Sequence, residues 1–144
     1  MIKKILAIDP GGTTGFSSNI SEEPYWQIAF ISNEVFRTYM LGFTNFDVWV
    51  CEGFYHRQKN KIEVSAIEQI AIVKELASAN NVELVLQNPS IKSTKGFWDD
   101  RKLKHLGLFK RRNSDTKHGI DALRHRLHYT ERNGMFDFNM LKGL

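Results

Sequence analysis

The sequence predicts an α/β fold, a mixed five-stranded sheet with helices on both faces. Three short apolar runs follow one another near the N-terminus, which favours an antiparallel meander. The later runs alternate with helical patterns, which favours parallel crossover units. No internal repeat or low-complexity linker divides the chain, so residues 1–144 are expected to form a single domain.

The expected strands are short and are closed by turn residues or by an acidic residue. The first is an apolar run that ends at Asp9 and is broken by a Pro-Gly-Gly turn. The fourth ends at Glu52, directly before a glycine. We expect the five strands at residues 5–9, 14–20, 25–32, 47–52 and 82–87.

Three helices are expected, at about residues 33–43, 61–79 and 115–131, with a long polar stretch before the third. The second is apolar around more of its surface than one packing face requires, which indicates either burial in the chain's own core or a dimer contact. The third combines an apolar stripe for packing with a polar stripe on its opposite side. The apolar stripe is Ile120, Leu123 and Leu127, and the polar stripe is His118, Asp121, His125 and His128.

Composition excludes several classes of protein. With 144 residues, 42% of them hydrophobic and 25% charged, the chain can bury a core and is too apolar to be disordered. No apolar run approaches the roughly 18 residues of a membrane span, so a cytoplasmic protein is expected. The single cysteine, Cys51, excludes an internal disulfide and a cysteine-rich zinc site.

Positive charge is concentrated in one third of the chain. Residues 92–132 carry 12 basic and 5 acidic side chains, whereas the rest carries 8 basic and 11 acidic ones. A basic segment on a nearly neutral body indicates a polyanionic partner, and nucleic acid is the first candidate. The alternative is a solvated surface that only keeps the protein soluble.

Three acidic residues stand where two strands end and a helix begins. Asp9 and Glu52 each close a predicted strand, and ligands gather at the carboxyl ends of parallel strands. Asp121 lies early in the last helix, three residues after His118 and on the same face. Such carboxylates suit Mg²⁺ or Mn²⁺, and a pair of these ions can hydrolyse a phosphodiester. Spacing alone supports a structural role equally well, with Asp9 capping a turn, Glu52 on the surface and Asp121 starting the helix.

Two other chemistries agree less well with the sequence. The histidines His118, His125 and His128 could reach a zinc ion, but neither an HExxH motif nor a cysteine partner accompanies them. Cys51 is a poor nucleophile because it lies in an apolar strand beside Glu52, where the pKa of a thiol rises.

Three short motifs together resemble those of the RuvC-like Holliday junction resolvases, a family of the RNase H-like superfamily. They are Ile-Asp-Pro-Gly at residues 8–11, Val-Cys-Glu at 50–52 and His-Gly-Ile-Asp-Ala-Leu at 118–123. The resemblance covers about residues 2–128, and the compact length is similar to that of bacteriophage-encoded members, which act in the bacterial host cytoplasm. It implies an RNase H-like mixed sheet, in agreement with the order of elements expected above.

The resemblance also implies an activity and a catalytic site. The family cleaves four-way DNA junctions as a homodimer, with paired nicks and two Mg²⁺ or Mn²⁺ ions per site. Asp9, Glu52 and Asp121 would be the metal-binding carboxylates, and His118 would be a further ligand or a general base. The helix at 61–79 would form the dimer contact, and no small-molecule cofactor is expected.

A DNA-binding surface follows from the same resemblance. An aromatic residue after the catalytic glutamate would stack on junction bases, and lysines would contact phosphates of the cleaved strand, with a basic run extending that surface. Residues 96–100 depart from the family's pattern, and Asp115 is a fourth acid that could be a ligand or an N-cap. The expected DNA-binding residues are Phe54, Tyr55, Lys92, Lys102, Lys110, Arg111 and Arg112.

Three alternative functions remain open from the sequence. The run from Asp9 to Gly15 also resembles the phosphate loop of the actin, hexokinase and Hsp70 superfamily, whose members need a second domain. A nuclease that acts on RNA–DNA hybrids would use the same carboxylates. A junction-binding module without catalysis would use the basic third alone. The expectation carried forward is a magnesium-dependent, structure-selective endodeoxyribonuclease.

Overall fold

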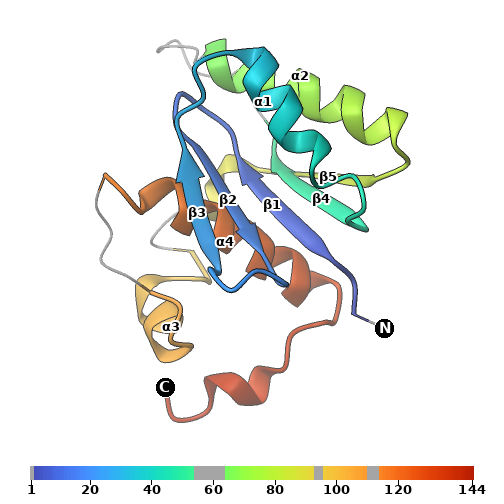
Figure 1. Cartoon of the computed structure of the whole chain (residues 1–144). Coiled ribbons are helices and arrows are strands. Elements are labelled where there is room, and N and C mark those ends of the chain that lie inside the picture. The colour runs from blue at the N-terminus through green and yellow to red at the C-terminus, as the bar shows by residue number, and fades with distance from the viewer. Residues whose placement is uncertain (1, 54–63, 93–95, 110–113) are drawn as a thin grey trace.

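The computed structural model describes residues 2–53, 64–92, 96–109 and 114–144, without the side chain of Lys92. It contains the predicted mixed five-stranded sheet, in the order β3-β2-β1-β4-β5 (Figure 1). Strand β1 pairs antiparallel with β2, which pairs antiparallel with β3, whereas β1–β4 and β4–β5 are parallel. The strands are β1 (Ile5–Asp9), β2 (Thr14–Ser18), β3 (Tyr25–Ile28), β4 (Val48–Glu52) and β5 (Glu83–Gln87).

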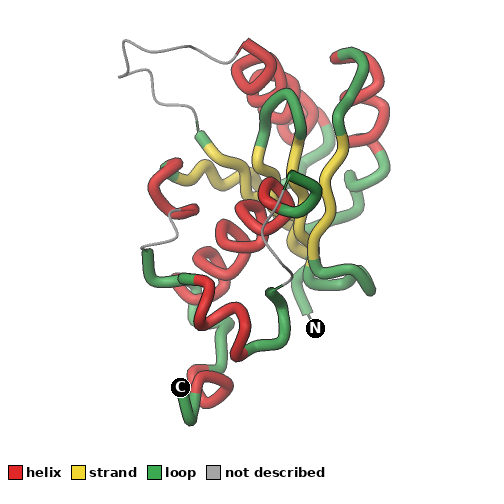
Figure 2. Tube along the Cα trace, turned by 90° about the vertical axis from the view of Figure 1, so that its left-hand side faces the viewer, coloured by secondary structure: helices red, strands yellow, loops and turns green. Residues whose placement is uncertain are grey.

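Helices lie on both sides of this sheet (Figures 1 and 2). One side is covered by α1 and α2, and α4 crosses the other side with α3 packed beside it. The helical segments are α1 (Asn33–Leu41), α2 (Val64–Ala79), α3 (Asp100–His105), α4 (Lys117–Arg132) and the short 3₁₀ turns η1 (Pro89–Lys92) and η2 (Phe138–Leu141). No helix in the described ranges is long and apolar enough to cross a membrane.

Strands β1 and β4 are buried on both faces, which explains why they are nearly continuous apolar runs. Leu6, Ile8, Trp49 and Cys51 face α1 and α2, and the residues between them face α4. Because side chains alternate along a strand, the acidic residues that end β1 and β4 point to the α4 side. Alternation thus directs both carboxylates to one face of the sheet.

The ends of several elements differ from the prediction. Strand β2 stops at Ser18, and β3 stops at Ile28 because the following residues lead into α1, where the Ser32 hydroxyl accepts a hydrogen bond from the Val35 amide at 3.2 Å. Helix α4 begins at Lys117, so the start expected at Asp115 was two residues early. Residues 61–63, expected in the second helix, lie outside the described ranges.

Helix α3 was not predicted. It occupies six residues of the stretch that was expected to be only polar, and its N-cap is Asp99, whose side chain accepts from the Lys102 amide. A single apolar residue, Leu103, is fully buried and packs against α4. A helix this short presents too few apolar residues for a period to be visible in the sequence.

The burial of two helices adds to the sequence analysis. In α4, Ile120, Leu123 and Leu127 pack in one apolar cluster, as expected, but much of the opposite side is buried as well, and so are Arg124 and Arg126. In α2, Ile72 and Leu76 are buried in the chain's own core, whereas Val64 and Ile67 remain exposed. The chain's own core therefore accounts for most of the apolar surface of α2.

Candidate active site

Four of the predicted site residues converge at one edge of the sheet. Asp9 and Glu52 end the parallel neighbours β1 and β4, and both face α4, which carries His118 and Asp121. Asp9, Glu52 and Asp121 are all buried. The Nδ1 atom of His118 lies 3.4 Å from Oδ2 of Asp9. The structural alternative that placed Glu52 on the surface is therefore wrong.

Among the described residues, potential ligand atoms form two adjacent groups that share Asp9. One group is Asp9, His118 and Asp121, and the other is Asp9, Glu52 and His125. Within each group the ligand atoms all lie within 4.8 Å of one another. Three carboxylates and two imidazoles in this arrangement could hold divalent cations that prefer oxygen and nitrogen ligands.

His125 joins the site through a contact that sequence reasoning missed. Its Nδ1 atom lies 2.8 Å from Oε1 of Gln87, at the end of β5, and its Nε2 atom lies 3.3 Å from Oε1 of Glu52. The spacing of four residues from Asp121 was the available signal; it had placed His125 on the same helix face and, with His118 and His128, among possible zinc ligands. Gln87 could have been found from its place at the end of a strand parallel to β4.

The tautomer of His125 fits a bound cation. A neutral imidazole with its proton on Nδ1 would donate to the Gln87 amide oxygen. Its Nε2 lone pair would then face Oε1 of Glu52, and these two acceptors would repel each other. A cation or a proton between the two atoms would relieve that repulsion, and the buried ligand set is suited to a metal ion.

Arg124 holds Asp121 in place. Its side chain is fully buried, and Nη1 donates to Oδ1 of Asp121 at 3.3 Å. Nε donates to the backbone carbonyl of Trp98 at 2.7 Å, and Nη2 pairs with Asp100. One guanidinium thus connects the start of α3 to the carboxylate on α4. Only the spacing of three residues from Asp121 could have suggested this contact.

The N-terminal end of α4 approaches β2 and β3 closely, and two glycines allow it. A Cβ atom on Gly15 would lie 1.8 Å from the backbone oxygen of His118, and one on Gly119 would lie 3.0 Å from the Trp26 oxygen. Gln27 on β3 accepts hydrogen bonds from the His118 and Gly119 amides through Oε1. Gly15, which had been considered as part of a phosphate loop, is needed for helix packing.

The loop after β1 is attached to α2. Gln69 accepts from the Gly11 amide and donates to the Gly11 carbonyl, both at 3.0 Å, and also accepts from the Thr14 hydroxyl at 2.9 Å. The Gly11 amide is thus already used inside the protein. This pattern weakens the comparison with a nucleotide phosphate loop, which presents free amides.

The remaining residues singled out in the sequence have separate outcomes. His128 belongs to neither ligand group of the described residues, and burial lowers its pKa. Asp115 is exposed, belongs to neither group and precedes the N-cap, Thr116. Burial, and next the neighbouring Glu52, raise the pKa of the Cys51 thiol, as predicted.

Among the predicted DNA-binding residues, Lys102 has its side chain in the described part of the structure. Lys102 lies on α3, with its ammonium 4.4 Å from the ring centre of Phe97. The other six fall outside the described part of the structure, Lys92 by its side chain: Phe54, Tyr55, Lys92, Lys110, Arg111 and Arg112.

Comparison with known proteins relates the chain to solved structures. No protein-family model matches it, and no curated protein does. The RuvC structure of Thermus thermophilus is 14% identical, covers 92% of this chain and 97% of its own, and has a TM-score of 0.61. T. thermophilus RuvC in complex with a Holliday junction substrate is also 14% identical, with 93% and 98% coverage and a TM-score of 0.62. The fowlpox virus Holliday junction resolvase is 16% identical, with 90% and 99% coverage and a TM-score of 0.55.

These similarities extend over nearly the whole of each chain, and the identities are low. They agree with the mixed sheet order and with the helices on both of its faces. The chain has the RNase H-like α/β fold of the RuvC-like Holliday junction resolvases.

Proposed function

We propose that the chain is a structure-selective endodeoxyribonuclease that resolves four-way DNA junctions by metal-dependent hydrolysis. The observation that carries this proposal is the pair of ligand groups that share the buried Asp9. The fold shared with resolvases supports the choice of substrate, because one of those structures holds a Holliday junction.

Two Mg²⁺ or Mn²⁺ ions would be held by these groups, one by Asp9, Glu52 and His125 and the other by Asp9, His118 and Asp121. Bound there, they would lower the pKa of a water molecule and stabilise the leaving oxyanion. Asp9 would fix the two positions relative to each other, since it belongs to both groups. Arg124 would keep one carboxylate oxygen of Asp121 in place.

His118 differs from the other site residues in its exposure. Its side chain is 29% exposed, against 1% for Asp9 and 0% for His125. It can therefore meet a substrate or exchange a proton with solvent, which suits a general base as well as a ligand. A fully buried histidine at this position could act as a ligand but could not reach substrate or solvent.

The basic segment is smaller as a surface than its composition indicates. Arg124 and Arg126 are buried, so they do not belong to an exposed phosphate-binding surface. The Arg124–Asp100 pair links the start of α3 to the site, and this helix carries Lys102 and Lys104. We infer that α3 contributes to the DNA-binding face, where phosphate contacts make binding fall steeply with salt.

The test is cleavage of a mobile four-way junction beside a linear duplex and an RNA–DNA hybrid, with Mg²⁺, with Mn²⁺ and with a chelator. We expect paired symmetric nicks in the junction only, in the presence of metal. Asp9→Asn should abolish cleavage and leave metal-free junction binding intact, because it changes the shared carboxylate and little of the volume.

Three outcomes would contradict this assignment. Full activity of a folded Asp9→Asn protein would show that the Asp9 carboxylate has a structural role and is not needed for cleavage. Cleavage of the RNA–DNA hybrid alone would support the metal site but show that the substrate is the hybrid and not the junction. Tight junction binding with no cleavage of any substrate would indicate a binding module.

Paired nicking requires two sites, so we also propose a homodimer. Val64 and Ile67 are exposed on α2 and provide an apolar contact of the kind that a second copy could cover. Light scattering at micromolar concentration should give twice the monomer mass, and Ile67→Glu should reduce it to the monomer mass. A wild-type monomer would exclude paired nicking by a preformed dimer.

A further inference from the structure

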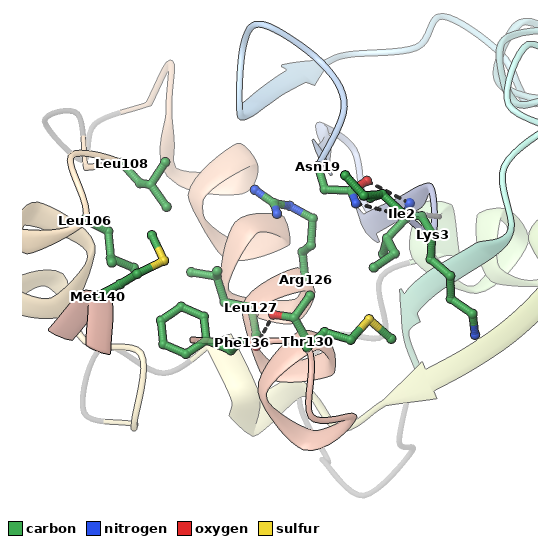
Figure 3. Close-up of a pocket in the computed structure, with 12 residues that line it drawn as sticks. Ile2, Lys3, Asn19, Leu106, Leu108, Arg126, Leu127, Thr130, Phe136 and Met140 are labelled. Atoms are coloured by element: carbon green, nitrogen blue, oxygen red, sulfur yellow. Dashed lines mark hydrogen bonds between the residues drawn. The ribbon is translucent and has the colours of Figure 1, made fainter. Parts of the chain in front are cut away.

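A pocket of about 590 Å³ lies on the α4 side of the molecule (Figure 3). It is bounded by the start of β1, the C-terminal half of α4, the segment after α3 and the last residues of the chain. None of the five candidate metal-binding residues lines it. Its apolar walls include Ile5, Leu106, Leu108, Leu127, Phe136 and Met140.

One buried cation opens onto this apolar space. Arg126 is 9% exposed, and in Figure 3 its guanidinium rises from α4 between Leu108 and Asn19, which also line the pocket. Nε donates to the Ser17 hydroxyl at 2.8 Å, and that hydroxyl donates to the Pro24 carbonyl. The guanidinium is thereby anchored to β2 through one nitrogen, and its other two nitrogens are directed away from that bond.

Within the described ranges, no acidic residue pairs with the Arg126 guanidinium. None is among the residues that line the pocket, and no ion pair of Arg126 occurs there. The second ionic group at the pocket is Lys3, whose ammonium pairs with Glu83 at 3.7 Å. Burial lowers the pKa of Arg126 to about 10, which leaves the group charged at neutral pH. Arg124, two residues earlier on the same helix, is fully buried but pairs with both Asp100 and Asp121.

The buried guanidinium and the apolar walls together indicate which kind of ligand the pocket would bind. A buried charge is costly unless it is paired, so an anion at the guanidinium would be stabilised. A carboxylate can accept two parallel hydrogen bonds from an arginine. The apolar walls would favour a hydrocarbon body over a hydrated phosphate backbone, and the volume lies in the range of small-molecule pockets.

We propose that this pocket binds a small amphipathic carboxylate of the medium-chain fatty acid class. The head group accepts hydrogen bonds from the free side of the Arg126 guanidinium, and the chain lies against Leu108, Leu127 and Phe136. The proposal does not depend on the nuclease assignment, because the two sites share no residue.

The first test is calorimetric titration of the whole chain with three probes. Decanoate has both the charge and the chain, decanol has the chain alone, and acetate has the charge alone. We expect decanoate to bind saturably at one site per chain and to raise the melting temperature as mass action requires. Decanol and acetate should bind at least about tenfold more weakly, because each lacks half of the match.

Substitution at the pocket wall provides a second test that leaves Arg126 intact. Leu108 is half-buried, so Leu108→Glu and Leu108→Gln form a matched pair that differs mainly in charge. We expect the glutamate variant to bind decanoate at least about tenfold more weakly than the glutamine variant, through repulsion of the head group. Arg126→Gln should lose the preference for decanoate over decanol.

The proposal would be overturned by equal binding of decanoate and decanol to the wild type. It would also be overturned by equal affinities of the two Leu108 variants, or by no saturable binding of decanoate. If Arg126→Gln fails to fold, the Leu108 pair still decides.

Discussion

The two faces of the sheet are packed with different kinds of side chain. Toward α1 and α2, Phe16, Trp26 and Phe43 stack on one another, within a cluster of almost purely apolar residues. Toward α4, β1 and β4 end in Asp9 and Glu52, whose polar side chains are also buried. Because neighbouring residues on a strand point to opposite faces, one sequence of five residues supplies both environments. Alternate positions of a strand therefore face either the apolar core or the candidate site.

The largest expected effect compares two adjacent residues of β4. Glu52→Gln should lower the cleavage rate at least about 100-fold, since it removes a candidate ligand where loss of an outer-shell partner alone costs 10–100-fold. Cys51→Ala, on the opposite face, should leave the rate nearly unchanged and cost about 1–2 kcal/mol of unfolding free energy. The measurements are single-turnover cleavage and urea unfolding of both variants.

Loss of cleavage in a folded Cys51→Ala protein would contradict the expectation that activity depends on the residues facing α4 and not on those facing α1 and α2. So would full activity of Glu52→Gln at limiting metal concentration.

A smaller effect is expected at the positioning residue Arg124. Arg124→Met leaves two carboxylates without their buried partner, and should cost about 3 kcal/mol of unfolding free energy. Asp100→Asn is milder, because that carboxylate is 39% exposed, and should cost about 1 kcal/mol or less. Both should raise the Mg²⁺ concentration for half-maximal cleavage, with a larger shift for Arg124→Met.

A purely structural role for Arg124 predicts a different result. Unfolding free energy would then fall while the Mg²⁺ dependence of the folded fraction stayed at the wild-type value. Arg124→Lys keeps the positive charge but loses the planar guanidinium with its several donors. Its Mg²⁺ requirement should therefore lie between those of the wild type and Arg124→Met.

The smallest expected effect concerns pH. Burial lowers the pKa of His128 in the folded protein below its ordinary value of 6.5, so the unfolded chain binds the proton more tightly. The resulting loss of stability is absent well above 6.5 and grows as the pH falls below it. His128→Gln should therefore reduce the difference in unfolding free energy between about pH 7.5 and about pH 5. An unchanged difference would place the pH dependence in other groups.

Sequence reasoning succeeded where a rule of local geometry applied. The apolar runs ending in Asp9 and Glu52 predicted the strands, and the parallel pairing of those strands placed the two carboxylates at one edge. The resemblance at residues 118–123 added His118 and Asp121, and the structure places both beside Asp9. The fold class followed from the order of the elements.

It failed where the outcome depended on contacts between distant segments. Nothing local to Gln87 or Arg124 indicates that one faces His125 and the other links α3 to Asp121. Counting charges between residues 92 and 132 could not distinguish exposed lysines from Arg124 and Arg126, which are buried. Their burial depends on which segments pack against α4, and those segments are distant in the sequence.

The attachment of Gly11 to Gln69 has a consequence for how the site opens. Gln69 holds both backbone polar groups of Gly11 and lies on α2, among residues buried in the apolar core. The loop beside Asp9 therefore cannot detach unless a buried helix shifts. Hydrogen exchange at the Gly11 amide should thus be slow, although it lies in a loop, and should approach the rate set by unfolding of α2. The edge of the sheet that carries the candidate site is consequently expected to be as rigid as the apolar face and to move only together with α2.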